Sequence, residues 1–256
     1  MTYAGVLKRA LLASLVVGVL AGAYMLVAVE PVIDRAIALE EQLATGEPAD
    51  DGHDHHHEPL YSRGEQKGGG FGAMVLYALA LGLVFGTVFA WRRHGLPGAT
   101  DFVRAVWLAV VGFAVFGLLP AVKYPASPPG VGDPDTVGER TLQYVGLIAL
   151  ALVATIALAR LSKFLRSRVD DPTRVVAVAS IAVVAFALAY LLLPDSPDEI
   201  AAAIPAELVW DFRLRSLGGL AITWLGFGLL FGWFLSRPPA AGDDLVARPR
   251  SVRATS

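Results

Sequence analysis

Six runs of apolar residues constrain this chain more than any other feature. A bilayer core about 30 Å thick requires roughly 20 residues of apolar helix to cross it. The runs are close to this length, and none contains Asp, Glu, Lys, Arg or His. We expect spans at about residues 11–29, 71–91, 105–122, 142–159, 175–193 and 217–235. The sequence therefore predicts an all-α integral membrane protein, a bundle of about six transmembrane helices that forms a single membrane domain over residues 1–256.

The composition separates this protein from a soluble helical bundle, which is the main alternative. Helices of a soluble bundle need a polar stripe that faces water, whereas these runs are apolar on every side. Of the 256 residues, 55% are hydrophobic and 17% are charged, against about a quarter charged in a typical soluble domain. A second alternative concerns the first run only, because Lys8 and Arg9 precede it and Ala21-Gly22-Ala23 resembles a signal-peptide cleavage site.

The basic residues outside the spans predict which side of the membrane each loop faces. Lys and Arg prefer the cytoplasmic side. Fourteen of them fall on one side of a six-span topology and seven on the other. The fourteen are Lys8, Arg9, Arg92, Arg93, Arg104, Arg160, Lys163, Arg166, Arg168, Arg174, Arg237, Arg248, Arg250 and Arg253. The seven are Arg35, Arg63, Lys67, Lys123, Arg140, Arg213 and Arg215. We therefore expect a multi-pass protein of a bacterial plasma membrane with both termini in the cytoplasm.

The segment after the first span is long and acidic. Its beginning, residues 31–43, has apolar residues at helical spacing, so we expect it to extend the first helix beyond the membrane. Residues 45–70 lack a core-forming pattern, and we expect a mobile loop outside the cytoplasm. Residues 30–70 hold ten acidic and three basic side chains, a net charge of about −7 that should concentrate cations there. At the other end of the chain, residues 238–256 should form a disordered cytoplasmic tail.

One cluster of side chains in the acidic loop is suited to binding a metal ion. Four of the five His residues lie within six consecutive positions, together with two carboxylates: His53, Asp54, His55, His56, His57 and Glu58. Imidazole is a ligand suited to zinc, copper, nickel and cobalt, and carboxylates can complete such a site. The alternative is a solvated acidic loop that is His-rich without binding metal. The residues do not identify the metal, because affinity alone would favour copper over nickel, cobalt or zinc.

The rest of the sequence argues against catalysis and against nucleic acid as a partner. The absence of cysteine excludes disulfides, thiolate metal sites and Fe–S clusters. The chain contains no phosphate-binding loop, nucleophile triad or dinucleotide fingerprint, and its net charge of −2 offers no general basic surface. A mobile loop also lacks the rigid geometry that a catalytic metal needs. We therefore expect neither an enzyme nor an organic cofactor.

Within the spans, the sequence indicates close packing more clearly than a route for an ion. Three pairs of glycines at a spacing of four would let helices approach closely: Gly18 and Gly22, Gly82 and Gly86, and Gly228 and Gly232. Ion-coupled pumps usually place ionisable residues at the membrane centre, and these spans have none. The polar side chains that remain for a route are Gln143, Thr87, Thr155, Ser180 and Thr223.

Three residues near the outer ends of the first two spans are candidates for the mouth of a pathway. Glu30 directly follows the first span, although an interfacial carboxylate or a cap near Pro31 explains it equally well. Met25 and Met74 should lie in the outer half of the membrane, where a thioether can contact a soft metal ion. Packing is the more common role of such methionines.

Two further stretches and the order of the features carry a family resemblance. The stretches are Leu119–Pro125 (LPAVKYP) with Pro128–Pro134 (PPGVGDP), and Trp210–Ser216 (WDFRLRS). They follow an amino-terminal span and an acidic loop containing HDHHHE. This arrangement resembles the CbtA family of probable cobalt transporter subunits over roughly residues 7–237. That family is commonly described as having five spans, one fewer than the number counted above.

The resemblance implies uptake of cobalt, or of nickel, that feeds corrinoid synthesis; zinc is also open as the ion. It further implies a small single-span partner that carries His residues, of the CbtB type. On this hypothesis the loop captures the ion, and Lys123, Asp133, Asp211 and Arg213 in the two stretches shape the mouth of the pathway. The alternative is a membrane protein that binds or senses metal and docks a partner without transporting the ion. A homo-oligomer is compatible with either hypothesis.

Overall fold

The computed structural model describes residues 1–46, 61–132, 134–197 and 200–238. All regular elements in these residues are helical, and six helical units are long and apolar enough to cross a membrane. The predicted all-helical membrane fold is therefore confirmed. The helices are α1 (Tyr3–Tyr24), α2 (Glu30–Gly46), α3 (Arg63–Arg92), α4 (Asp101–Phe113), α5 (Leu119–Lys123), α6 (Val137–Leu165), α7 (Asp171–Leu192), α8 (Ala206–Ala221) and α9 (Phe227–Leu235).

Three of the long helical rods contain a π-helical turn of five residues that joins two α-helices without breaking the rod. These turns are η1 (Met25–Val29) between α1 and α2, η3 (Ala114–Leu118) between α4 and α5, and η5 (Ile222–Gly226) between α8 and α9. The rod made of α1, η1 and α2 confirms the prediction that the first helix continues beyond its apolar run. Its extension buries Val32 and Ala36 against Leu208 of α8.

The second rod, α3, begins earlier than the sequence predicted. The expected span started at residue 71, and residues 45–70 were expected to form a mobile loop. In the structure Arg63 to Gly70 are already helical. The reason is a capping box: Ser62 accepts a hydrogen bond from the Glu65 amide, and the Glu65 side chain accepts one from the Ser62 amide. This local signal outweighs the cost of the three consecutive glycines that follow it.

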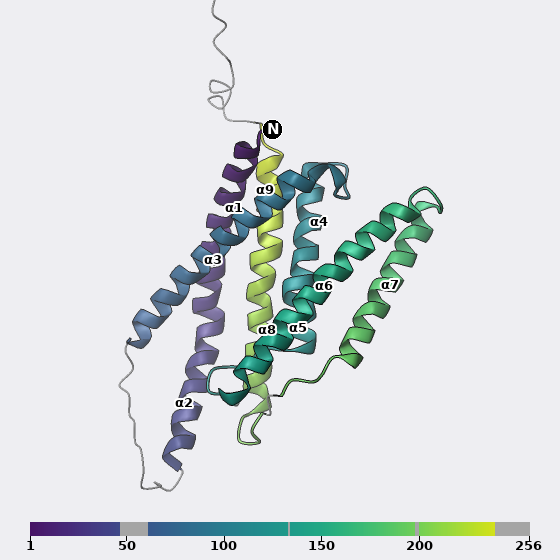
Figure 1. The fold of residues 1–256 in the computed structure, drawn as a ribbon. Helices are drawn as coiled ribbons and strands as arrows, with labels where there is room; N and C mark the ends of the chain where they lie inside the picture. The colour runs from purple at the N-terminus through teal and green to yellow at the C-terminus, as the bar shows by residue number, and fades with distance from the viewer. Residues whose placement is uncertain (47–60, 133, 198–199, 239–256) are drawn as a thin grey trace, which may run out of the picture.

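The core of the molecule lies where α1, α3, α4 and α9 pack together (Figure 1). Two phenylalanines of α3 meet two of α9 edge to face: the ring centroids of Phe85 and Phe227 are 4.8 Å apart, and those of Phe89 and Phe231 are 5.2 Å apart. Such aromatic pairs contribute about 0.5–1.5 kcal/mol beyond their buried area. Trp224 of η5 also belongs to this core, and its ring is stacked on that of Phe116 in η3.

The glycine pairs predicted from the sequence do lie at close helix contacts. A Cβ added at Gly82 in α3 would come within 2.5 Å of the Ser14 hydroxyl of α1. One added at Gly22 in α1 would lie 2.7 Å from the ring of Phe71. The same holds at the second interface, where Gly228 of α9 faces Ala109 of α4. The predicted role of these glycines in close packing is therefore confirmed.

The helices α6 and α7 form a hairpin that stands beside this core (Figure 1). The hairpin contacts the rest of the bundle through α6, which packs on η3 and α5, and through the end of α7, where Tyr190 lies beside Lys123 of α5. In α6 the buried residues are Leu147 and Ala151, and α7 has no buried residue at all. Both helices therefore present apolar side chains almost all round to their surroundings.

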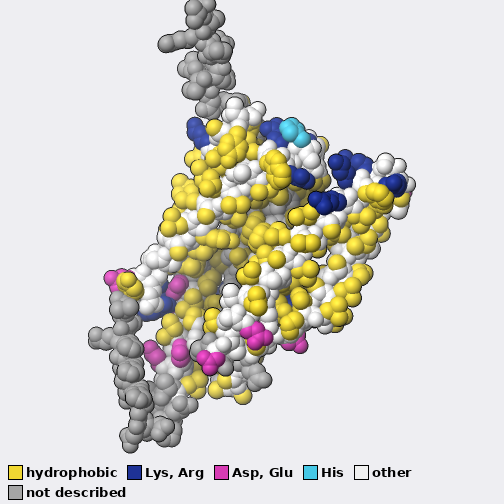
Figure 2. Space-filling view, viewed as in Figure 1, with side chains coloured by type: hydrophobic (Ala, Val, Ile, Leu, Met, Phe, Trp, Pro, Cys, Tyr) yellow, Lys and Arg dark blue, Asp and Glu magenta, His cyan; other side chains and the backbone are white. Residues whose placement is uncertain are grey.

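The two ends of the bundle differ in charge. At the end where the chain begins, Figure 2 shows Lys and Arg side chains, both on the core and at the tip of the α6–α7 hairpin. At the opposite end it shows Asp and Glu side chains near the ends of α2, α3 and α6. We refer to these as the basic end and the acidic end. The charge asymmetry expected from the loops is thus a property of the folded molecule.

Candidate functional site

The predicted metal ligands, residues 53–58, lie outside the described residues. The two helices that flank them can be placed: α2 ends at Gly46 and α3 begins at Arg63, both at the acidic end (Figure 1). Among the described residues, no three His, Asp or Glu side chains are arranged so that they could hold a metal ion. The acidic end is therefore the place to examine for the remaining candidates.

Glu30 is the buried end of an ion-pair network between α2 and α3. Its carboxylate is largely buried and lies 2.8 Å from the guanidinium of Arg63. The same guanidinium reaches Asp34 at 2.6 Å, and the ammonium of Lys67 reaches Asp34 at 2.7 Å. Two carboxylates are thus matched by two cations, which stabilises a buried acid at the rim of the membrane. The network holds the start of α3 against the first rod.

The π-helical turn η1 sets which side chains of the first rod face α3. In this turn the Glu30 amide donates to the carbonyl of Met25, five residues earlier. Met25 packs its Cε against Gly70 of α3, one helical turn before Met74. Met25 and Glu30 therefore both face α3, and both methionines are half-buried. These contacts are helix packing; they do not bring the two thioethers and Glu30 into one ligand set.

The second family-like stretch joins α8 to the first rod. Asp211 is 2.6 Å from Arg35 of α2 and 3.5 Å from Arg215 one turn along α8. Arg215 also donates to the carbonyl of Ala28 at 2.8 Å, within the π-helical turn η1. Arg215 follows Asp211 by four residues, a spacing at which opposite charges on one helix can pair. The bond to Ala28 supplies a donor to a backbone oxygen in an irregular part of the helix.

The first family-like stretch ties the α6–α7 hairpin to the core. Lys123 has only 4% of its side chain exposed, and its ammonium lies 2.7 Å from Asp195, which is 99% exposed. The ammonium also lies 5.0 Å from the ring centroid of Tyr190 near the end of α7. Beside it, Tyr124 donates its hydroxyl to the carbonyl of Pro194 at 2.9 Å. We call these contacts of Lys123 and Tyr124 the clasp.

The remaining candidates at the acidic end take part in loop packing or cannot be described. Arg213 donates its Nε to the carbonyl of Ala126 at 3.2 Å. The carboxylate of Glu40 in α2 packs directly against Gly130, whose φ of +72° favours glycine. Asp133 lies outside the described residues. Lys123, Asp211 and Arg213 thus all lie at one end of the bundle, but each binds a different partner.

The polar side chains inside the spans do not converge. The hydroxyls of Thr87, Thr155 and Thr223 each donate to the carbonyl four residues earlier in their own helix. This is the usual way for a hydroxyl to be satisfied in a membrane helix. Ser180 is exposed on α7, and Gln143 lies near the start of α6, where its amide donates to Glu139. Within the described parts of the spans, the structure therefore gives no line of polar groups that crosses the membrane.

Sequence reasoning missed several partners of these residues. Arg63, Lys67 and Arg35 were counted only as loop charges, and Asp34, Asp195 and Tyr190 were not singled out. Their roles depend on which helices are neighbours, and a single sequence does not give that information. The capping box Ser62–Glu65 is the exception: its pattern could have placed the start of α3 and with it Arg63 and Lys67 on a helix.

The fold and the acidic end together define a class: a multi-pass helical membrane protein whose charged groups lie at its two ends and whose spans carry none. The family model described as probable cobalt transporter subunit (CbtA) matches residues 4–236. The chain therefore belongs to the CbtA family, and its resemblance to that family is confirmed. No curated protein and no solved structure matches the chain.

Proposed function

We propose that this protein is the membrane subunit of a divalent-metal uptake system, with cobalt as the favoured ion. The observation that carries the proposal is the family match over residues 4–236. The second observation is that four His residues lie in the sequence between the last residue of α2 and the first residue of α3, and both of these helix termini lie at the acidic end. His53, His55, His56 and His57 capture the ion outside the cell, and Asp54 and Glu58 complete its ligands. The protein is not an enzyme.

The charge distribution supports an orientation with both termini in the cytoplasm. Basic residues gather at the end that holds the amino terminus and the end of α9, and such residues favour the cytoplasmic side. The acidic end then faces outward, where its negative charge raises the local concentration of cations. The stretches with Lys123 and Asp211 frame the mouth of the pathway on this side, and Met25, Met74 and Glu30 lie close to it.

A partner subunit supports transport in this proposal. The spans carry no ionisable residue, and their threonine hydroxyls are engaged within their own helices. A divalent ion in such surroundings would have few ligands. A small single-span subunit with His residues would add them, in keeping with the description of the family as a transporter subunit.

Uptake of radiolabelled cobalt at limiting concentration tests the proposal. Cells that lack the protein should take up less cobalt than cells that contain it. A variant with His53, His55, His56 and His57 changed to Ala should need a higher external concentration for the same uptake rate. The matched control is His94→Ala, because His94 lies in η2 (Arg93–Gly95) at the basic end. Equal uptake with and without the protein would refute transport.

A second function has a specific observation in its favour. The absence of a continuous polar route in the described spans suits a protein that binds or senses metal outside and docks a partner. In that case the purified protein would bind cobalt, but liposomes containing it would show no cobalt flux, either alone or with a single-span His-bearing subunit. Flux that appears only with the second subunit would favour transport.

A further inference from the structure

The tip of the α6–α7 hairpin, residues 160–174, carries a dense group of basic side chains. They are Arg160, Lys163, Arg166, Arg168 and Arg174, and Figure 2 shows Lys and Arg side chains gathered at this tip. The first four are exposed to the surroundings. Arg160, Lys163 and Arg166 follow one another at a spacing of three residues along the end of α6, where like charges repel. An anion placed among them would relieve that repulsion.

The two acidic residues of the tip are already engaged at the start of α7. Asp171 lies 3.0 Å from Arg174, and Asp170 accepts a hydrogen bond from the Thr173 amide at 3.2 Å. The basic residues at the end of α6 make no ion pair within the described chain: Arg160, Lys163 and Arg166. Their positive charge is therefore not offset by the carboxylates nearest to them in the sequence.

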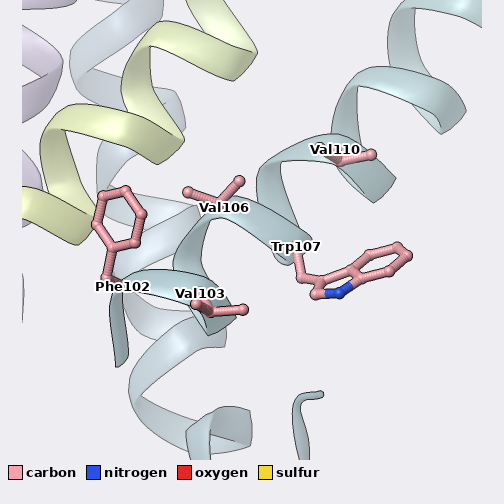
Figure 3. A pocket seen from close by; sticks show the side chains of 5 residues that line it. All are labelled: Phe102, Val103, Val106, Trp107 and Val110. Atoms are coloured by element: carbon pink, nitrogen blue, oxygen red, sulfur yellow. The ribbon is translucent and has the colours of Figure 1, made fainter. Parts of the chain in front are cut away.

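The core has a different arrangement at the same end of the bundle. Arg93 and Arg104 both contact Asp101, at 3.3 and 2.9 Å. Three further arginines bind a backbone carbonyl or stack on an indole ring: Arg9, Arg92 and Arg237. The side chains that line the hollow on α4 are all apolar: Phe102, Val103, Val106, Trp107 and Val110 (Figure 3). The cations of α6 differ from those of the core in lacking such partners.

The tip emerges from two helices whose surroundings are lipid. No residue of α7 is buried. Ile156 near the end of α6 and Val176 near the start of α7 are both more than half exposed. Phe164 is also exposed, and the guanidinium of Arg168 lies 3.6 Å from its ring centroid. The lipids whose chains cover these side chains bring their headgroups to the level of the cations, and clusters of Lys and Arg at the end of a membrane helix attract anionic headgroups.

We propose that the tip of the α6–α7 hairpin binds the headgroups of anionic phospholipids through Arg160, Lys163 and Arg166, with Arg168 and Phe164 at the boundary with the lipid chains. The group recognised is a phosphate diester with a net negative charge. A zwitterionic headgroup offers the same phosphate beside an amine and is discriminated against. Bound headgroups give the hairpin an attachment at the end opposite the clasp. This inference is independent of which ion, if any, the protein carries.

Native mass spectrometry of the full chain in detergent tests the site, with phosphatidylglycerol and phosphatidylcholine of the same acyl chains as competing probes. The wild type should retain phosphatidylglycerol in preference. Changing Arg160, Lys163 and Arg166 together to Gln should weaken its binding about a hundredfold, at roughly fivefold for each basic residue. Binding of phosphatidylcholine should not change. The matched control changes three cations of the core that have partners, Arg9, Arg92 and Arg237, to Gln, and should keep the preference.

A variant with the opposite effect keeps the test decisive if the triple variant of α6 does not fold. Asp171→Asn releases Arg174 from its ion pair and should strengthen retention of phosphatidylglycerol about fivefold. Inorganic phosphate should displace this lipid no more than chloride does at the same ionic strength.

Four results would overturn the proposal. The first is equal retention of both lipids by the wild type, which would leave the tip to an acidic protein segment. The second is a preference that survives in the folded triple variant of α6, or that falls as far in the core control. The third is an Asp171→Asn variant that binds phosphatidylglycerol no more tightly than the wild type does. The fourth is displacement of the lipid by phosphate beyond the effect of ionic strength, which would indicate a site for the free anion.

Discussion

The packed core and the α6–α7 hairpin are built from equally apolar helices, yet they are stabilised in different ways. In the core, α1 and α3 touch through glycines, and four phenylalanines interlock between α3 and α9. In the hairpin, Gly138 and Gly146 of α6 have open space where a side chain would lie. Apolar character alone therefore does not decide which helices pack.

The difference follows from the membrane as a solvent. Lipid chains are as apolar as leucine, so helices associate only where their shapes allow close van der Waals contact. The glycines of α1, α3 and α9 provide that shape. The helices α6 and α7 lack it and are joined to the core mainly at one end, where Lys123 and Tyr124 reach residues 190–195. Substitutions in the core should thus change the free energy of unfolding, and substitutions in the clasp should change the position of the α6–α7 hairpin.

The largest expected effect comes from a matched pair of glycine substitutions. Gly82→Val in α3 places methyl groups against Ser14, which is fully buried. Such overpacking should lower the free energy of unfolding by about 1–3 kcal/mol. Gly146→Val in α6 has the same change in helix propensity but meets no neighbour, so it should be close to neutral. Thermal unfolding in detergent measures both; a similar loss in the two variants would contradict the division between core and hairpin.

The clasp should have an intermediate effect that appears in the position of the hairpin. Asp195→Asn leaves the ammonium of Lys123 buried without its ion pair, whereas Lys123→Met replaces it by an apolar chain of similar size. We expect the hairpin to shift or loosen in both variants, and the protein to be less stable in Asp195→Asn than in Lys123→Met.

Because the chain has no cysteine, a pair introduced in α4 and α7 can carry spin labels for this measurement. The distribution of distances between the two labels should broaden in the clasp variants. It should stay narrow in Arg35→Gln, which breaks the ion pair between α2 and α8 and leaves the clasp intact. An unchanged distribution in both clasp variants would mean that lipid packing, and not the clasp, positions the hairpin.

The smallest effect should come from the cap of α7 at the tip of the hairpin. The side chain of Asp170 accepts a hydrogen bond from the Thr173 amide at 3.2 Å. A hydrogen bond with the Thr173 side chain, and then the one from its amide, lower the pKa of Asp170. The ionised cap therefore stabilises α7 fully above the usual pKa of about 3.9, and this contribution is lost as the pH falls through the lowered value.

Asp170→Ala should speed amide hydrogen exchange in the first turn of α7 at neutral pH. Asp170→Asn should not, because asparagine caps equally well, but it should remove the pH dependence. No change in Asp170→Ala would show that this tip is already frayed in the native protein.

The sequence by itself determined the six apolar spans, the charge asymmetry of the two ends, the glycine contacts and the family. Each of these depends on residue type and spacing along one helix, which the chain states directly. The ion-binding hypothesis for residues 53–58 also comes from the sequence and remains a prediction.

Only the tertiary structure decided which residues meet. Arg63 pairs with Glu30 because the turn η1 directs Glu30 toward α3, and Lys123 pairs with Asp195, 72 residues away, because α7 returns to the acidic end. Nor does the sequence state that α6 and α7 stand outside the core, since all six runs are similarly apolar. In a membrane, apolar residues are stable against lipid and against protein alike, so only the fit between helix surfaces selects the neighbours.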